Sequence, residues 1–270
     1  VIAVTSRSFC KNTALVSELK MRYSQVILNE TGKTLAGNEL INFLSKADKA
    51  IIGIEEMSAE HLAKIPNLKV ISKYGVGLNN IDLGYCKSHN IKLGFIPGVN
   101  KQSVAELALT LILISLRKIH TNHAEILRGE WPQAKGLELR GKKVGILGFG
   151  NIGQTLAKLL SIFDCEISFF DEKIFTENEL LDICVSHSLQ LDHIKQKKLS
   201  DVLSESDIIS IHLPLNDETA NIINTQAFEC LKQSVVIVNT ARGGIVNEVD
   251  MANFLLSNPN SFAAFDVFSD

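Results

Sequence analysis

The chain has 270 residues, of which 46% are hydrophobic. This length and composition can form a packed core and are more typical of two domains than of one. The net charge is −3, and no cluster of basic residues stands out, which argues against a protein that binds nucleic acid or a membrane surface. Five cysteines, odd in number and without a C-x-x-C pair, favour reduced thiols in a cytoplasmic protein.

The first residues, VIAVTSRSFC, lack the basic stretch and long apolar segment of a signal peptide, and they predict a strand. The longest apolar run, residues 107–116, is too short to cross a bilayer and is flanked by Glu106 and Arg117. We therefore predict a buried helix there and no membrane span.

Short runs rich in Val and Ile alternate with helical patterns along the whole chain. Because these runs are apolar throughout rather than alternating, they predict strands that are buried on both faces, as in parallel sheets built from βαβ units. The predicted strands cover residues 1–6, 25–30, 50–54, 69–74, 92–96, 142–150, 166–171, 207–213, 235–240 and 262–268. The polar stretch 172–198 predicts only a weak strand or a loop.

Pro97 and Gly98 mark the predicted boundary between a domain of residues 1–98 and a domain of residues 99–270. Ser103 followed by Glu106 has the spacing of a capping box, which predicts that a helix starts there and continues to about residue 120. Few charges interrupt this segment, so the helix is expected to pack between the two halves.

The segment VGILGFGNIG contains Gly148, Gly150 and Gly153 in the spacing G-x-G-x-x-G, directly after a predicted strand. Such glycines allow a tight turn, a close approach of backbone to a pyrophosphate, and close packing of the following helix. The helix begins near Asn151 and Ile152, and its free N–H groups can bind phosphate. An ordinary glycine turn between strand and helix is the alternative.

Asp171 ends the next predicted strand, about 18 residues after Gly153. A carboxylate at this place accepts hydrogen bonds from the ribose hydroxyls of an adenosine and repels a 2′-phosphate. The strand, loop, helix and acid together predict dinucleotide binding and favour NAD over NADP, although Lys173 lies close by. A routine turn aspartate is the alternative for Asp171.

At this point the sequence resembles the D-isomer-specific 2-hydroxyacid dehydrogenases, the family of phosphoglycerate dehydrogenase and glyoxylate/hydroxypyruvate reductase. The resemblance rests on VISKYGVGLNNIDL, PGVNKQSVAELAL, LRGKKVGILGFGNIG, SDIISIHLPLNDET, VVIVNTARGGIVNE and AAFDVF, which follow in family order over nearly the whole chain. It implies two Rossmann-like, doubly wound α/β domains, the first for substrate and the second for NAD.

The resemblance also implies roles for residues in the substrate loop and in the later motifs. The N–H groups of Val76 and Gly77 would hold a substrate carboxylate, and Asn100 would donate to substrate oxygens unless it only caps a turn. Arg242 would pair with the carboxylate and polarise the neighbouring carbonyl, with a surface ion pair as the alternative. The residues expected to line the cofactor are His212, Pro214, Thr219, Thr240, Ala241, Arg242 and Asp266. His212 is not expected to be the catalytic base.

Two further catalytic groups are implied beyond Asp270: a Glu at about the next position and a general-acid His some tens of residues later. The strand at 262–268 is therefore expected to be an inner strand of a longer polypeptide, on the order of 300 residues or more.

The predicted function is an NAD-dependent oxidoreductase, likened to phosphoglycerate dehydrogenase, that acts on a small D-2-hydroxy or 2-oxo acid as a cytoplasmic homodimer without a metal. A dinucleotide-sensing regulatory protein on the same fold is the alternative. Glu55 and Glu56 follow the third strand and argue against a phosphorylated substrate, and Lys73 is the residue that can compensate for them.

Overall fold

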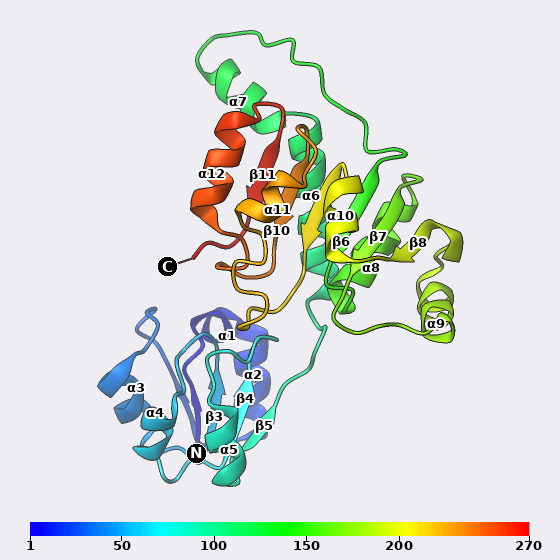
Figure 1. The fold of residues 1–270 in the computed structure, drawn as a ribbon. Coiled ribbons are helices and arrows are strands. Elements are labelled where there is room, and N and C mark those ends of the chain that lie inside the picture. Colours follow the sequence, from blue (N-terminus) through cyan, green and yellow to red (C-terminus); the bar gives the residue numbers. More distant parts are fainter. Residues whose placement is uncertain (270) are drawn as a thin grey trace. The chain divides into compact units, whose positions relative to one another are not determined.

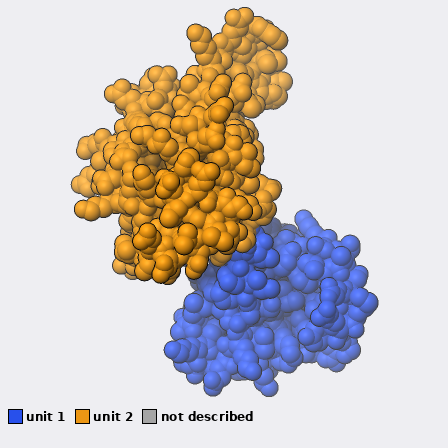
Figure 2. Space-filling model, turned by 90° about the vertical axis from the view of Figure 1, so that its right-hand side faces the viewer, with its two compact units in different colours: residues 1–100 blue, residues 101–270 orange. Residues whose placement is uncertain are grey.

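The fold was obtained as a computed structural model, and it describes residues 1–269. Contacts divide the chain into two compact units, Val1–Asn100 and Lys101–Asp270, which Figure 2 colours separately. Each unit is a parallel α/β layer structure with helices on both faces of one sheet (Figure 1).

Unit 1 contains five parallel strands in the order β2-β1-β3-β4-β5. This is the flavodoxin-like arrangement, in which the winding direction reverses between β1 and β3. The strands are β1 (Ile2–Val4), β2 (Val26–Leu28), β3 (Lys49–Ile52), β4 (Val70–Lys73) and β5 (Lys92–Gly94). The helices are α1 (Arg7–Lys11), α2 (Thr13–Arg22), α3 (Gly37–Leu44), α4 (Ala59–Ala63) and α5 (Leu83–Ser88).

The core of unit 1 has two layers, because alternate residues of each strand face opposite sides of the sheet. Ala3 and Ile52 pack with apolar residues of α3, α4 and α5. Ile2 and Val4 pack on the other side with Phe9 of α1 and with apolar residues of α2.

Unit 2 contains six parallel strands in the order β11-β10-β9-β6-β7-β8. Numbered within the unit, this is the order 6-5-4-1-2-3, which defines a Rossmann sheet. The strands are β6 (Lys143–Leu147), β7 (Glu166–Phe170), β8 (Ile194–Gln196), β9 (Ile208–Ile211), β10 (Val236–Asn239) and β11 (Phe262–Phe265). The helices are α6 (Lys101–Leu116), α7 (Ile119–Leu127), α8 (Asn151–Ser161), α9 (Glu177–His187), α10 (Leu199–Glu205), α11 (Thr225–Glu229) and α12 (Glu248–Ser257), with a 3₁₀ turn at Leu191–His193.

The two faces of this sheet carry separate clusters. Val144 and Ile146 face α6, α8 and α9, while Leu147 faces α10, α11 and α12. The prediction of two doubly wound parallel-sheet domains is confirmed, and the ten predicted strands all correspond to observed ones.

Two segments predicted from the sequence need correction. The helix predicted over 103–120 begins at Lys101 and ends at Leu116, and Lys118 then adopts a left-handed conformation before α7. Ser103 therefore lies inside the helix, and the Glu106 carboxylate accepts a hydrogen bond from the Gln102 amide at 2.7 Å instead of capping the helix start.

The segment 172–198, predicted as a weak strand or loop, contains the three-turn helix α9 as well as the short edge strand β8. A capping box starts α9: the Thr176 hydroxyl accepts from the Glu179 N–H, and the Glu179 carboxylate accepts from the Thr176 N–H.

Strand β11 is an edge strand among the residues that the structure describes. Its prediction as an inner strand depends on residues beyond Asp270 and stays a prediction. No helix within residues 1–269 combines the length and the apolar character needed to cross a membrane.

Candidate functional site

The register of the sheet in unit 2 aligns the ends of five strands. Phe170, Leu147, Ile211, Asn239 and Phe265 are direct partners across neighbouring strands. The residue after each of them therefore lies in one row along the carboxyl edge of the sheet. That row contains Asp171, Gly148, His212, Thr240 and Asp266, all of which were predicted to be cofactor-binding residues.

The backbone continues the ladder for one step past the strands at several of these positions. The N–H of Gly148 donates to the Phe170 carbonyl at 2.8 Å, and the N–H of His212 donates to the Leu147 carbonyl at 2.7 Å. The N–H of Asp266 donates to the Asn239 carbonyl at 3.0 Å. These bonds fix the row, which includes the switch point between β6 and β9, where doubly wound sheets bind ligands.

The three glycines of the loop meet different surroundings. A Cβ on Gly148, which has φ +96°, would lie 2.7 Å from the His212 carbonyl oxygen. A Cβ on Gly153 would lie 2.3 Å from the Gly148 carbonyl oxygen. A Cβ on Gly150 would meet nothing within 4 Å, so the backbone there is open to a ligand.

Helix α8 begins at this opening. Gly150 is its N-cap residue and has no side chain to accept hydrogen bonds from the first turn. The N–H groups at Asn151 and Ile152 therefore remain available to an anion, and the helix dipole adds a partial positive charge.

The Asp171 carboxylate is anchored to the loop by backbone donors. One oxygen accepts from the Phe149 N–H at 2.6 Å, and the other accepts from the Lys173 N–H at 3.0 Å. Two oxygens have capacity for about four hydrogen bonds, so the carboxylate can still accept a ribose diol. The Lys173 ammonium is paired with Glu179 at 2.8 Å and lies 4.7 Å from the Phe175 ring centre, which commits it elsewhere.

His212 is partly buried at the end of β9, and the burial of its ring lowers its pKa to about 4. Its Nε2 is 2.9 Å from the Ser210 hydroxyl, while its Nδ1 is inaccessible and has no hydrogen-bond partner. The Thr240 hydroxyl is likewise buried without a partner. Unpaired buried polar atoms are rare and costly, so two of them in the same row of strand ends suit a polar ligand that can form hydrogen bonds with them.

Arg242 follows β10 in a turn that Asn239 organises. The Asn239 amide donates to the Arg242 carbonyl at 2.9 Å, and its oxygen accepts from the Ala241 N–H at 3.0 Å. The Arg242 side chain is exposed, donates to the Ala241 carbonyl at 2.7 Å, and has no carboxylate partner among residues 1–269. The surface ion pair considered as an alternative is therefore not present in the described part of the chain.

Sequence reasoning did not identify Asn239 or Ser210 as functional residues, although both support predicted ones. The signal available for Asn239 was a polar residue at the end of a fully apolar strand. The Thr219 hydroxyl donates to the Pro214 carbonyl at 2.6 Å, so these two predicted cofactor contacts also shape the loop after β9.

The substrate loop follows β4 in unit 1. Gly75 has φ +136°, and Val76 and Gly77 come directly after it. The Lys73 ammonium donates to the Gly53 carbonyl and to the Asn80 side-chain oxygen at 2.6 Å, which braces the loop against the end of β3. Asn100 lies in the turn before α6. Lys73, Val76 and Gly77 belong to unit 1, and Arg242 belongs to unit 2.

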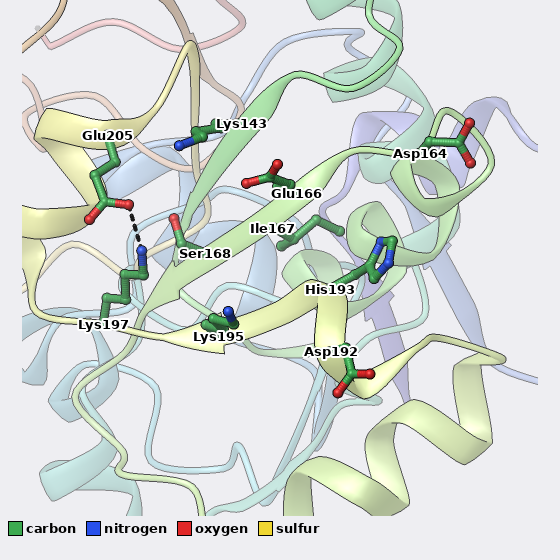
Figure 3. Close-up of a pocket in the computed structure, with 10 residues that line it drawn as sticks. All are labelled: Lys143, Asp164, Glu166, Ile167, Ser168, Asp192, His193, Lys195, Lys197 and Glu205. Carbon is green, nitrogen blue, oxygen red and sulfur yellow. Dashed lines mark hydrogen bonds and ion pairs between the residues drawn. The ribbon is translucent and has the colours of Figure 1, made fainter.

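A cavity of about 510 Å³ lies elsewhere in unit 2 (Figure 3). Lys143 and Glu166 start β6 and β7, so the cavity opens near the opposite ends of the strands from the glycine loop. Its lining mixes charges of both signs, and Lys197 pairs with Glu205 across one side at 2.5 Å. It forms no part of the candidate site. No cluster of three or more metal-ligating side chains occurs in the part of the chain that the structure describes.

Comparison with known proteins defines the class to which this fold and site belong. The family model for the D-isomer specific 2-hydroxyacid dehydrogenase, NAD binding domain, matches residues 109–270. The chain therefore belongs to the D-isomer specific 2-hydroxyacid dehydrogenases, NAD-dependent oxidoreductases that act on CH–OH donors.

Individual relatives extend the similarity over both units. Hydroxypyruvate reductase of Thermotoga maritima is 34% identical over 91% of this chain and 78% of its own length. D-3-phosphoglycerate dehydrogenase of Mycobacterium tuberculosis is 32% identical over 86% of this chain, but over only 43% of its own length. The structure of D-lactate dehydrogenase from Aquifex aeolicus, solved with NAD and lactic acid, superposes with a TM-score of 0.83 at 25% identity, covering 100% of this chain and 77% of that one.

Proposed function

We propose that the chain transfers a hydride between NAD and a small D-2-hydroxy or 2-oxo acid. The observation that carries this proposal is the single row of strand ends that joins Gly148, Asp171, His212 and Thr240 in register. In this proposal residues 1–98 bind the substrate and residues 99–270 bind the dinucleotide.

The chain's own groups hold the dinucleotide in three places. The open backbone at Gly150 and the N–H groups that begin α8 receive the pyrophosphate. The anchored Asp171 carboxylate accepts the ribose hydroxyls and disfavours a 2′-phosphate. His212 Nδ1 and the Thr240 hydroxyl find partners in the half of the cofactor that carries the nicotinamide.

NAD supplies the hydride chemistry when it is bound. The protein orients the acid: the N–H groups of Val76 and Gly77 bind its carboxylate, Asn100 donates to its oxygens, and Arg242 pairs with it while polarising the carbonyl to be reduced. Asp266, in the same row, faces the amide of the nicotinamide.

Substrate identity is the finer part of the proposal. Glycerate-type and lactate-type acids share the 2-hydroxy acid group, and relatives are named for 3-phosphoglycerate, hydroxypyruvate, glyoxylate and lactate. The test is NADH oxidation with 3-phosphohydroxypyruvate, hydroxypyruvate, glyoxylate and pyruvate. Turnover well above background with any of them supports a dehydrogenase, whereas tight NADH binding with background rates throughout supports the dinucleotide sensor.

We also propose that the protein is a cytoplasmic homodimer. Support for the dimer comes from apolar side chains exposed on α7 and the segment after it, with Ile126 at 52%, Leu127 at 74% and Trp131 at 81% exposure. Sedimentation equilibrium measures the assembly, and Leu127→Glu should shift it toward the monomer. The cytoplasmic location rests on cysteine usage and is tested by cell fractionation.

A further inference from the structure

Unit 1 contains a cavity between the ends of β1 and β3 that has no role in the function proposed above. Its volume is about 340 Å³, and its lining residues come from three consecutive places along the carboxyl edge of the sheet. Residues Ser6, Arg7, Ser8 and Lys11 follow β1; residues Gly53, Ile54 and Glu55 follow β3; and Tyr74 follows β4.

This position is the topological switch point of unit 1. The chain turns from β1 to β2 on one side and reaches β3 on the other, so the loops after β1 and β3 diverge and leave a crevice. Sheets with this strand order bind ligands at that place. The backbone pairing with β3 continues for one residue past β1 and past β4. The Thr5 N–H donates to the Ile51 carbonyl, and the Tyr74 N–H donates to the Ile52 carbonyl.

The cavity is lined by two cations, Arg7 and Lys11. Arg7 and Lys11 are exposed, and neither forms an ion pair with any of residues 1–269. Ser6, which also lines the cavity, is buried, and its hydroxyl lies 3.2 Å from the Ser8 hydroxyl. Two hydroxyls and two cations around one cavity are the groups that bind a carboxylate or a phosphate.

Glu55 is the one acid in the lining, and its carboxylate is already engaged. Glu55 is 2% exposed, and one of its oxygens accepts from the Gly53 N–H at 2.6 Å. Glu56 is exposed but does not line the cavity. Counting Arg7 and Lys11 against Glu55 leaves one net positive charge, which suits a small anion more than a neutral group.

We infer that this cavity binds a second anionic group of the substrate, distinct from the carboxylate at the reacting carbon. This inference rests on the proposed function, and it identifies the substrate class as a 2-oxo or 2-hydroxy acid with a carboxylate or phosphate at its far end. Tyr74 lines the cavity and lies two residues before Val76, so one molecule can reach from the substrate loop into the cavity. Arg7 and Lys11 are then specificity residues rather than catalytic ones.

The first experiment measures binding without turnover. Backbone amide NMR shifts of the ¹⁵N-labelled protein are followed during titration with glutarate, with its singly charged counterpart valerate, and with inorganic phosphate. We expect glutarate or phosphate to shift the signals of Ser8, Gly53 and Ile54, and valerate to leave them in place. The two arms distinguish a carboxylate site from a phosphate site.

Variants of the two cations then test the cause. Arg7→Gln and Lys11→Gln should each weaken anion binding about tenfold, because each removes one charge-assisted contact. Arg7→Lys should bind more tightly than Arg7→Gln, because it keeps the positive charge. Lys20→Gln is the matched control, because Lys20 is an exposed cation on α2 outside the cavity. Equal binding by the Arg7→Gln, Lys11→Gln and Lys20→Gln variants would overturn the inference.

Kinetics separate this inference from the proposed function. If the protein is a dehydrogenase with this specificity site, kcat/KM should be higher for 2-oxoglutarate than for 2-oxopentanoate, or higher for 3-phosphohydroxypyruvate than for hydroxypyruvate. Arg7→Gln should lower kcat/KM only for the substrate that carries the second anionic group. Turnover without such a preference would refute the second-anion site but would still support the dehydrogenase function. Anion binding at Arg7 without turnover of any acid refutes the dehydrogenase and leaves the cavity as an anion site of its own.

Discussion

Alanine at Gly153 should lower the stability of the fold, whereas alanine at Gly150 should lower the affinity for NADH, because the two glycines serve different purposes in one loop. A methyl group on Gly153 would lie 2.3 Å from the Gly148 carbonyl oxygen, which is 1.1 Å short of the 3.4 Å where ordinary contact begins. The loop has no room to retreat, since the position of a Cβ on Gly148 is itself 2.7 Å from the His212 carbonyl oxygen. Helix α8 must therefore move away from the sheet.

The cost follows from two opposing effects. Overpacking a rigid site costs about 1–3 kcal/mol, and the upper end applies because the obstacle is backbone. Alanine inside a helix regains about 1 kcal/mol over glycine. The net loss for Gly153→Ala is thus about 2 kcal/mol, or a fall of roughly 4–8 °C in the melting temperature for a domain of this size.

Gly150→Ala should leave the fold nearly unchanged. No atom lies within 4 Å of the added methyl group, and the backbone angles of Gly150 (φ −82°, ψ −158°) suit alanine. The weaker N-cap costs about 1 kcal/mol, and the lower entropy of the unfolded chain returns about 0.4–1 kcal/mol. The methyl group does, however, occupy the opening proposed for the pyrophosphate, so NADH affinity should fall at least about tenfold.

Thermal unfolding without cofactor and titration of NADH fluorescence measure the two effects separately. The expected pattern is an earlier transition for Gly153→Ala, and a normal transition with weak NADH binding for Gly150→Ala. If Gly150→Ala unfolds as early as Gly153→Ala, or binds NADH as tightly as the unaltered protein, the opening at Gly150 is not the pyrophosphate site.

The sequence predicted the strands well because parallel sheets covered on both faces leave long apolar runs. Residues Lys143–Leu147 illustrate this: Val144, Ile146 and Leu147 are all fully buried, although they face different helices. Helix α9 was missed because only Cys184 is buried in it and the remaining residues are largely polar. Its capping box, Thr176 with Glu179, was the local signal that could have revealed it.

The roles of single residues were less predictable than the elements. The Ser103–Glu106 spacing predicted a helix start, but the chain was already helical from Lys101, and Glu106 found a partner in Gln102. The turn at Arg242 depends on the buried amide of Asn239, whose two hydrogen bonds become visible only once the turn is built. Spacing along a sequence does not distinguish such competing partners.

The candidate site depends on register, which a single sequence does not contain. Motifs around Gly148, Asp171 and His212 were recognisable separately, but their alignment in one row follows from strand pairings between segments far apart. The cavity at Arg7 was not predicted for the same reason. Its residues follow β1, β3 and β4, and they meet only because β1 and β3 are neighbours in the folded sheet.

Three further changes test the dinucleotide and substrate roles. Asp171→Ser should narrow the preference for NADH over NADPH about tenfold or more, because it removes the carboxylate that Phe149 and Lys173 hold; an unaltered protein that uses both equally would contradict this. Arg242→Ala should abolish turnover while NADH affinity changes little, and Arg242→Lys should be nearly as poor, because one ammonium cannot replace a bidentate fork. A parallel loss of NADH affinity would instead assign Arg242 to the cofactor. His212 should make stability depend on pH, because burial lowers its pKa to about 4 whereas the unfolded chain titrates near 6.5. Between these values the unfolded chain binds a proton that the folded protein does not, so stability is complete above about pH 6.5 and falls as the pH is lowered toward 4. The difference in pKa sets an upper limit of about 3 kcal/mol on the stability that His212 loses at low pH. The loss should be smaller than this limit, because the residue keeps some exposed surface although its Nδ1 has none. His212→Gln stays neutral throughout, so urea unfolding at pH 7 and pH 4.5 should show a smaller fall for the variant, and equal falls would mean that other groups cause the acid sensitivity.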